Sequence, residues 1–595
     1  MNVRSLLVAL WLAAGALGAS AAEPDPQATR AAQGLFERHW QWLAERFPEF
    51  ATYRGDPRYN DRLTDASPEA QAAADQRTRE WLAEAKAIPA DRLSPTDRVS
   101  LDMFIGARER EVATMAFPGW RTMLMGVLGG PQSNFADLML PTPVATAAQV
   151  EQLFARMGAY PRQMQHQIER MRSGIALGWV PGRDVLERVL RQIDVQLASR
   201  TEDSPYYGPF KRLGSAIPAD ERTALQARGR AAIERDVVPA LRRLRAFVAD
   251  EYLPKAPANG PLAGYPDGRA VYEMLVRQQT TTSLSAQQIH AIGQRELARL
   301  HGEIAGVMKT MKFEGDFAAF VKHLNSDPKY FAASPEALLA GYRDIAKRID
   351  AELPRLFAEL PRAPYGVRAM PAFRGPDAAE YYDRPAADGS RPGWFNAAAA
   401  GYLKKPSWGM ATLTAHEAVP GHHLQIARAV ELKGLPEFRR GGFGYVAFSE
   451  GWALYAETLG QEIGLYDDPA WRFGHLQAQA WRAVRLVVDT GIHALGWSRQ
   501  QAIDFMAERT GLNRDIVTSE VDRYTSTPGQ ALAYMIGQLK ITELRERAKA
   551  ALGPKFDIRR FHNAVIDQGA LPLDTLERVI DEWISAEAAR GKAPA

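Results

Sequence analysis

The sequence contains no cysteine among its 595 residues. Disulfide bonds are therefore excluded as a source of stability, and any metal site has to use histidine, aspartate or glutamate as ligands. Neither sign of charge is in excess, because 73 lysines and arginines balance 70 aspartates and glutamates. The basic residues are spread along the chain rather than gathered in a stripe, which argues against a nucleic-acid partner.

Long apolar runs are also scarce, and only the amino-terminal one stands out. Residues 1–22 combine a short basic start, an apolar stretch from Leu6 to Leu17 and small residues near the end. This order is typical of a signal peptide cleaved near Ala21 or Ala22. The stretch is shorter than the ~20 residues that a spanning helix needs, although an uncleaved anchor stays the alternative. Because no cysteine is present to carry a lipid, we expect a periplasmic or secreted protein without membrane attachment after cleavage.

Strand-like alternation is rare, whereas helix signals are frequent. Serine followed by proline supplies a side-chain cap and a suitable first helical residue, and such pairs begin at Ser67, Ser94 and Ser334. Ser285 with Gln288 has the spacing of a capping box. The hydrophobic content of 46% is ample for a large core. We therefore predict a mainly α protein, in which residues 23–595 form one helical domain.

The best strand candidate runs from Arg391 to Asn396, after the turn-forming residues 388–390. Pro392 cannot donate to a sheet ladder, so an edge strand is favoured over a central one. Such an edge could pair with the extended backbone of a peptide. A plain surface hairpin is the alternative interpretation.

The most informative segment is H-E-A-V-P-G-H-H, residues 416–423, which holds three of the eleven histidines. A helix with the pattern H-E-x-x-H places two imidazoles on one face, and its glutamate serves as a general base beside zinc. Here the second histidine comes two residues later. On an unbroken helix His416 and His422 would face opposite sides, whereas His423 would lie about 10 Å further along the axis.

Pro420 offers a way to bring the histidines together. It lacks the N–H that would bond the carbonyl of His416, and its ring clashes with that turn, so we expect a kink or bulge. The neighbouring Gly421 has no side chain to obstruct the distortion. The prediction is a zinc site with His416 and His422 as ligands, and with His423 as the alternative to His422.

A catalytic zinc needs a third protein ligand. The helical segment F-S-E-G-W-A-L-Y-A-E, residues 448–457, has glutamates seven positions apart on one face. Glu450 is the predicted ligand, and Glu457 is a candidate for orienting a ligand histidine. Glu417, directly after the first histidine, is the predicted general base. A buried cluster of histidines and glutamates without metal is the alternative.

Together these motifs resemble a bacterial family known as domain of unknown function 885. Further stretches that carry the resemblance are residues 48–65, 388–393, 520–524 and 528–534, so that it covers nearly the whole mature chain. The family in turn resembles the thermostable-carboxypeptidase group, thimet oligopeptidase and angiotensin-converting enzyme.

The resemblance implies a helical zincin-like fold, with a small β-sheet near the active site. It also implies a deep central cleft between two helical halves, which we place at about 23–360 and 361–595. A G-H-x-L step in the similar peptidases favours His422 as the second ligand. A P-G-x-x-x-x-Y step matches Tyr534, which is expected to stabilise the oxyanion, with Tyr524 in reserve.

Other residues are candidates for substrate binding. Arg523 and Arg391 could hold a peptide carboxylate, although salt bridges within the protein are the favoured interpretation of both. The further candidates are Tyr524, Gln530 and His423; Gln530 lies in the same family-like stretch as Tyr534, and Tyr524 lies in the stretch before it. The leading hypothesis is an exported zinc-dependent peptidase that hydrolyses short peptides. The alternatives are a metal-dependent amidase acting on a non-peptide amide, and a non-catalytic exported binding protein.

Overall fold

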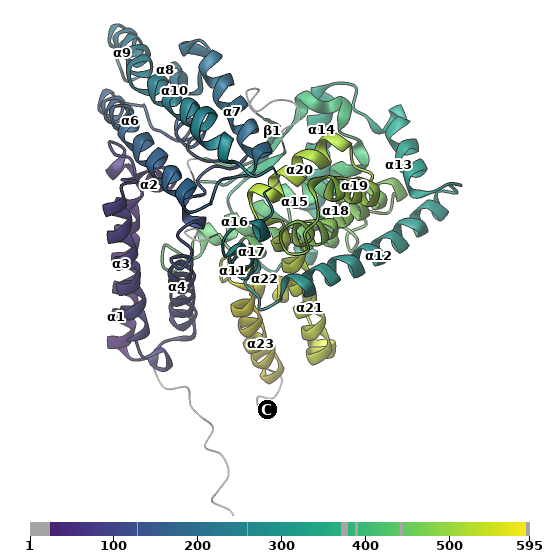
Figure 1. The fold of residues 1–595 in the computed structure, drawn as a ribbon. Helices are drawn as coiled ribbons and strands as arrows, with labels where there is room; N and C mark the ends of the chain where they lie inside the picture. The colour runs from purple at the N-terminus through teal and green to yellow at the C-terminus, as the bar shows by residue number, and fades with distance from the viewer. Residues whose placement is uncertain are drawn as a thin grey trace, which may run out of the picture.

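The computed structural model describes residues 24–590, except 128, 259, 371–378, 387–388, 390 and 441–443. The predicted signal peptide therefore lies outside the described residues, as do two of the three residues of the predicted turn at 388–390. Within the described ranges, no helix is both long enough and apolar enough to pass through a bilayer. The fold is mainly α, as predicted, with one small sheet (Figure 1).

The amino-terminal helices form two groups in Figure 1, with α1, α3 and α4 standing together below α6 to α10. The first group and its neighbours are α1 (Pro26–Arg46), α2 (Pro48–Tyr53), α3 (Pro68–Lys86), α4 (Pro95–Thr114) and α5 (Asn134–Leu138). The second group is α6 (Ala147–Ala176), α7 (Arg183–Ala198), α8 (Gly208–Lys211), α9 (Ala219–Ala232) and α10 (Val238–Ala246), with π-helical turns η6 (Ile233–Val237) and η7 (Phe247–Tyr252).

The second group has a hydrophobic core of its own, which draws its residues from 125 to 252. The larger core collects the first helices and almost everything from residue 262 onward. The Pro- and Gly-rich stretch near 254–268 carries the chain from one core to the other, since Leu253 packs on the smaller core and Leu262 lies in the larger. The division into halves at about residue 360 stays a prediction.

The remaining helices build the larger core. They are α11 (Gly268–Thr280), α12 (Ala286–Thr310), α13 (Phe317–Ser326), α14 (Pro335–Leu356), α15 (Met410–Glu417), α16 (His422–Glu431), α17 (Val446–Leu459), α18 (Pro469–His493), α19 (Arg499–Thr510), α20 (Arg514–Ser526), α21 (Ala533–Leu552), α22 (Ile558–Ile566) and α23 (Leu573–Ala589). Among them, α12 packs along α18, and α17 packs along α21.

Small residues set the close approach of α17 to α21. A Cβ on Gly451 would lie 2.5 Å from the Cα of Gly537, and a Cβ on Gly537 would lie 1.8 Å from the carbonyl oxygen of Ala447. Neither contact is sterically allowed, so the two helices require glycine where they cross. The crossing brings Glu450, on α17, beside the start of α21.

The predicted helix caps are present. The side chains of Ser67, Ser94 and Ser334 each accept a hydrogen bond from the backbone N–H three residues later. Ser285 and Gln288 form a complete capping box at the start of α12. These contacts satisfy N–H groups that have no partner within the helix, which explains why the helix starts could be read from the sequence.

The sheet has the order β1-β3-β2, from β1 (Tyr365–Ala369), β2 (Tyr381–Asp383) and β3 (Gly393–Ala397). The prediction of an edge strand at 391–396 is therefore wrong, because β3 is central and pairs with β1 in parallel and with β2 antiparallel. Pro392 lies just before the strand, where no ladder N–H is needed. With both sides of β3 paired, this strand cannot capture a substrate backbone.

Candidate metal centre

The sequence predicts one helix with a kink or bulge at Pro420. The structure instead has two separate helices, α15 and α16, joined by a short segment. α15 ends at Glu417, the Val419-Pro420 peptide bond is cis, and α16 begins at His422. Gly421 folds against the end of α15 so closely that a Cβ there would lie 2.0 Å from the carbonyl oxygen of His416. The indole N–H of Trp452 donates to the carbonyl of Pro420 at 2.9 Å, which ties the break to α17.

The break brings the two predicted ligand histidines together. The ring centroids of His416 and His422 lie 4.8 Å apart at an interplanar angle of 83°. The Oε2 atom of Glu450 lies 3.3 Å from Nε2 of His416 and 3.5 Å from Nε2 of His422. A carboxylate oxygen of Glu417 and one nitrogen from each histidine also lie within 4.8 Å of one another. Four predicted groups thus converge from three helices.

His423 does not join this cluster. Its Nδ1 lies 2.8 Å from the hydroxyl of Tyr382 on β2, and its ring packs on Tyr365 of β1 at 4.6 Å between centroids. A Cβ on Gly393 would lie 2.9 Å from the same Nδ1, so β3 also closes on the ring. His423 therefore joins α16 to the sheet, and the geometry favours His422 of the two alternatives.

A buried carboxylate fixes the orientation of His416. Oε1 of Glu457 lies 2.8 Å from Nδ1 of His416, which leaves Nε2 directed at Glu450. Glu457 is held in turn by Gln479, which donates to Oε2 at 3.2 Å, and by Arg482, whose guanidinium lies 3.6 Å from Oε1. The side chain of Glu457 is fully buried. Such an arrangement sets the tautomer and direction of a metal-ligating imidazole.

The charges in the cluster are strongly coupled. Burial lowers the pKa of His416, but the contacts with the carboxylates of Glu450 and Glu457 outweigh it and raise the pKa to about 9. Burial alone would raise the pKa of Glu450, yet the two histidines hold it well below its usual range. The Glu450 carboxylate is therefore ionised and the site attracts a cation, which in the metal-free protein is a proton on His416.

The pKa of Glu417 shifts upward, in the opposite direction to that of Glu450. Its burial raises its pKa, although the neighbouring His416 and His422 pull the pKa down. The side chain is 7% exposed, and no hydrogen bond from the described part of the chain holds its carboxylate. A carboxylate that is neither a structural acceptor nor fully hydrated suits a group that exchanges protons.

The donor atoms of the cluster fit a metal ion. Oε2 of Glu450 is shielded from solvent and lies 3.3 Å from Nε2 of His416 and 3.5 Å from Nε2 of His422, without a well-formed hydrogen bond to either ring. A buried carboxylate is costly unless a cation neutralises it. Two imidazoles and one carboxylate are the donor set of known catalytic zinc sites. His416, His422 and Glu450 are thus the residues that can hold zinc.

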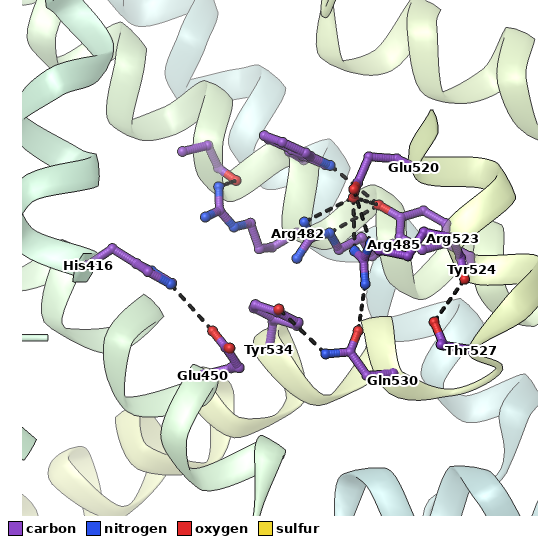
Figure 2. A network of polar contacts seen from close by, with 12 residues as sticks. His416, Glu450, Arg482, Arg485, Glu520, Arg523, Tyr524, Thr527, Gln530 and Tyr534 are labelled. Carbon is purple, nitrogen blue, oxygen red and sulfur yellow. Dashed lines mark hydrogen bonds and ion pairs between the residues drawn. The ribbon is translucent and has the colours of Figure 1, made fainter. Parts of the chain in front are cut away.

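Tyr534 lies beside Glu450, at the start of α21 (Figure 2). Burial and the charge of Glu450 raise its pKa, so the hydroxyl keeps its proton. Its hydroxyl accepts one long hydrogen bond, from Gln530 at 3.5 Å. Its hydrogen therefore stays available for a substrate oxygen, as the predicted oxyanion role requires.

A turn anchored by Asp489 places Tyr534. Gly529 adopts φ +80°, which favours glycine, and its N–H donates to both carboxylate oxygens of Asp489 at 3.0 and 3.1 Å. Asp489 also accepts from the hydroxyl of Tyr272 at 2.6 Å. Sequence reasoning missed Asp489, because a single acidic residue within a long helix carries no signal for such a contact.

Arg523 and Tyr524, the two substrate-binding candidates on α20, form hydrogen bonds with other side chains of the protein. Arg523 donates to both oxygens of Glu520 at 3.0 and 2.9 Å, and to Gln530 at 2.6 Å. Tyr524 donates to Glu520 at 2.7 Å and accepts from Arg485 at 3.0 Å. Their polar atoms are therefore engaged within the protein, which fits the salt-bridged alternative for Arg523.

Arg391 lies apart from the cluster of histidines. It is exposed and precedes β3 by two positions, and among the described residues its side chain contacts none of the predicted metal ligands. The predictions for Arg391 and for the tyrosines stay predictions about function.

A family model described as bacterial protein of unknown function (DUF885) matches residues 48–580. The chain therefore belongs to this family, and the resemblance found in the sequence is confirmed. No functionally curated protein matches the sequence. The family description assigns no activity, so function has to be argued from the site.

Solved structures show how the fold recurs. A predicted lipoprotein from Colwellia psychrerythraea is 28% identical, with a TM-score of 0.88 over 94% of this chain and 99% of that one. A second, from Shewanella oneidensis and of unknown function, is 18% identical, with a TM-score of 0.71 over 93% and 99% of the two chains. An oligoendopeptidase F-like protein from Bacillus anthracis has 12% identity and a TM-score of only 0.29, which supports no argument.

Proposed function

We propose that this protein is an exported zinc-dependent peptidase that hydrolyses short peptides. The observation that carries the proposal is the convergence of His416, His422 and Glu450 across a broken helix, with Glu417 beside them. A purely structural cluster would not need Glu417, a buried glutamate whose carboxylate receives no hydrogen bond from the described residues. A binding protein would need the ligands but not the base.

The three ligands would hold zinc, and the chemistry that zinc supplies there is polarisation of the scissile carbonyl and acidification of a water molecule. Glu417 accepts the proton of the attacking water and later delivers it to the leaving amine. Burial raises its pKa above that of an ordinary glutamate, which makes it a better proton acceptor that can still return the proton.

The remaining residues stabilise the oxyanion or orient the groups that take part in the reaction. Tyr534 donates its hydroxyl hydrogen to the oxyanion that develops on the former carbonyl. Glu457 keeps the Nδ1 atom of His416 engaged, so that only Nε2 faces the site. The Asp489 contact to Gly529 holds the turn that precedes Tyr534. Each of these groups is fixed before substrate arrives, which reduces the reorganisation needed during reaction.

The first test is Glu417→Gln. This change keeps the size of the side chain and removes the base, so we expect peptide hydrolysis to fall by roughly 10²- to 10⁴-fold. Zinc content should stay at the wild-type level, because Glu417 is not among the ligands. Hydrolysis is followed by mass spectrometry of a mixed peptide library, and zinc by elemental analysis of the same preparation. Unchanged hydrolysis in the variant would contradict the assignment of the base.

A matched control is Glu431→Gln. Glu431 ends α16 and accepts hydrogen bonds from the backbone N–H groups of Arg362 and Ala363, away from the cluster. This variant should keep both zinc and hydrolysis. A library that also contains non-peptide amides tests the second reading of the site, since preferential cleavage of those amides would replace peptides as the substrate class.

A further inference from the structure

Arg485, on α18, is a buried arginine with an unused donor. Its side chain is 7% exposed. Nε donates to the hydroxyl of Tyr524 at 3.0 Å, and Nη2 donates to Glu520 at 3.1 Å. Nη1 is shielded from solvent and has no acceptor among the described residues. A guanidinium carries five N–H donors in a rigid fork, so the two on Nη1 are left for a partner that the protein does not provide.

The charges around Arg485 do not cancel. Arg485 and Arg523 share a single carboxylate, that of Glu520. The nearby Arg482 pairs with Glu457, which also serves His416. The two arginines press the pKa of Glu520 down to about 2 against the effect of burial, so this carboxylate is fully ionised. Asp489 also interacts with Arg523, but its pKa of about 7 leaves it only partly charged at neutral pH, so the two guanidiniums are not fully neutralised. A buried excess charge is costly unless a counter-ion binds.

The excess charge lies close to the proposed reaction site. The guanidinium of Arg485 stacks over the ring of Tyr534, 4.5 Å from its centroid. The name arginine cluster denotes Arg482, Arg485, Glu520, Arg523, Tyr524 and Gln530. Figure 2 shows Tyr534 between the Glu450 side chain and this arginine cluster. The cationic group that would receive an anion is therefore in contact with the ring of the tyrosine that is proposed to meet the scissile carbonyl.

We infer that Arg485 binds the terminal carboxylate of the substrate, so that the enzyme acts near the C-terminus of peptides with a free carboxyl end. This inference rests on the proposed function. It assigns to Arg485 the role that the sequence suggested for Arg523, whose nitrogens are all engaged by Glu520 and Gln530. Planar guanidinium and carboxylate groups match one another in geometry, and their hydrogen bonds are strengthened by charge.

The experiment compares one peptide as the free acid and as the C-terminal amide. For the wild-type zinc enzyme, we expect a KM that is roughly 10- to 100-fold lower for the acid, the range that a hydrogen bond between charged groups supplies. Arg485→Lys should raise KM for the acid to the level of the amide. It should lower kcat/KM for the amide less than for the acid, so that the ratio of the two falls to about one, whereas damage to the fold would lower both alike and keep the ratio.

Arg472→Lys serves as the matched control on the same helix. Arg472 contacts Glu303 at 3.4 Å and Gln461, outside the cluster around Tyr534. The preference for the acid should survive this change. Equal KM values for acid and amide in the wild type would overturn the inference while leaving zinc-dependent hydrolysis intact, and so would a preference that survives in Arg485→Lys.

A binding measurement separates this inference from the failure of the proposed function. Hippurate and hippuramide differ only in the carboxylate, and their effect on Tm can be measured without zinc or turnover. We expect hippurate to raise Tm of the wild type but not of Arg485→Lys, and hippuramide to raise neither. If hippurate has this effect but the protein hydrolyses no peptide, the proposed peptidase activity is wrong and the carboxylate site still stands. Absence of the hippurate effect would overturn the site itself.

Discussion

The histidine cluster and the arginine cluster lie side by side, yet they are built differently. His416, Glu417 and His422 come from one short segment, and only Glu450 is added from α17. The arginine cluster takes Arg523, Tyr524 and Gln530 from one stretch of sequence and adds Arg485 from α18. In the histidine cluster the added residue, Glu450, belongs to a recognisable motif, whereas no motif marks Arg485. The histidine cluster could therefore be predicted whole, and the arginine cluster only in part.

The clusters also differ in how their polar atoms are satisfied. Around Tyr524 most donors have an acceptor among the described residues, whereas Nη1 of Arg485 and Nε of the nearby Arg482 have none. Around His416 the carboxylate of Glu450 faces both imidazoles without a well-formed hydrogen bond to either. The histidine cluster is short of a cation, and the arginine cluster is short of an anion. A peptide with zinc at its scissile carbonyl would supply what each of them needs.

The largest expected difference between the clusters is between their two tyrosines. Tyr534→Phe should lower kcat by roughly 10²- to 10³-fold with little change in KM, because its hydroxyl is predicted to act on the oxyanion. Tyr524→Phe should change kcat by only a few-fold, since its hydroxyl is engaged by Glu520 and Arg485. Steady-state kinetics of both variants and the wild type on one peptide measures the two losses in kcat. Equal losses in kcat would erase the distinction between the two clusters.

A smaller effect is expected for Glu457→Gln, which weakens the orientation of His416. Loss of such a supporting carboxylate costs roughly 10- to 100-fold in metal affinity. Competition with a chelator of known affinity measures the change. Glu462→Gln is the control, because Glu462 pairs with Arg545 at 2.5 Å rather than with a histidine. Zinc affinity that is the same in Glu457→Gln and wild type would show that the contact to Nδ1 has no bearing on the metal.

The smallest effect is expected on thermal stability. It comes from Asp489, which anchors the turn next to Tyr534. Burial raises the pKa of Asp489 to about 7 from an unfolded value of 3.8. The folded state then retains a proton that the unfolded state releases, so stability that is complete below pH 4 is lost as the pH rises to 7. Linkage of this size is on the order of 4 kcal/mol at most.

Asp489→Asn should therefore gain in Tm relative to wild type as the pH rises from 5 to 7, and the gain should level off above that. One amide oxygen can accept the hydrogen bonds that Oδ1 receives from Tyr272 and Gly529. Thermal unfolding at several pH values tests this expectation. A difference in Tm that is independent of pH would mean that Asp489 is ionised in the folded protein.

The sequence predicts those features that depend on neighbouring residues. The Ser-Pro helix starts follow from local hydrogen bonding, and the break at Pro420 follows from a missing N–H. The pairing of β3 on both sides could not be predicted, because Pro392 favours an edge but strand order depends on where β1 and β2 lie. Membership of the family followed from motifs that span most of the chain.

Arg482, Arg485 and Asp489 show why the part of the arginine cluster on α18 was not predicted. Their spacing of three and four residues places them on one face of α18, a pattern that normally indicates a solvent-exposed face. In the fold that face points inward, and Arg485 and Asp489 are buried. A polar stripe within a helix that is apolar on its other sides is a signal for an internal site, but only packing distinguishes it from an exposed surface.

The central claim is that His416, His422 and Glu450 hold one zinc ion. The most direct measurement is calorimetric titration of metal-free protein with zinc, for the wild type and for alanine variants of these three residues. We predict one site per chain in the wild type and a loss of tight binding in each variant that keeps its helical circular dichroism. A wild-type protein that binds no zinc, or folded variants that bind it undiminished, would contradict the account.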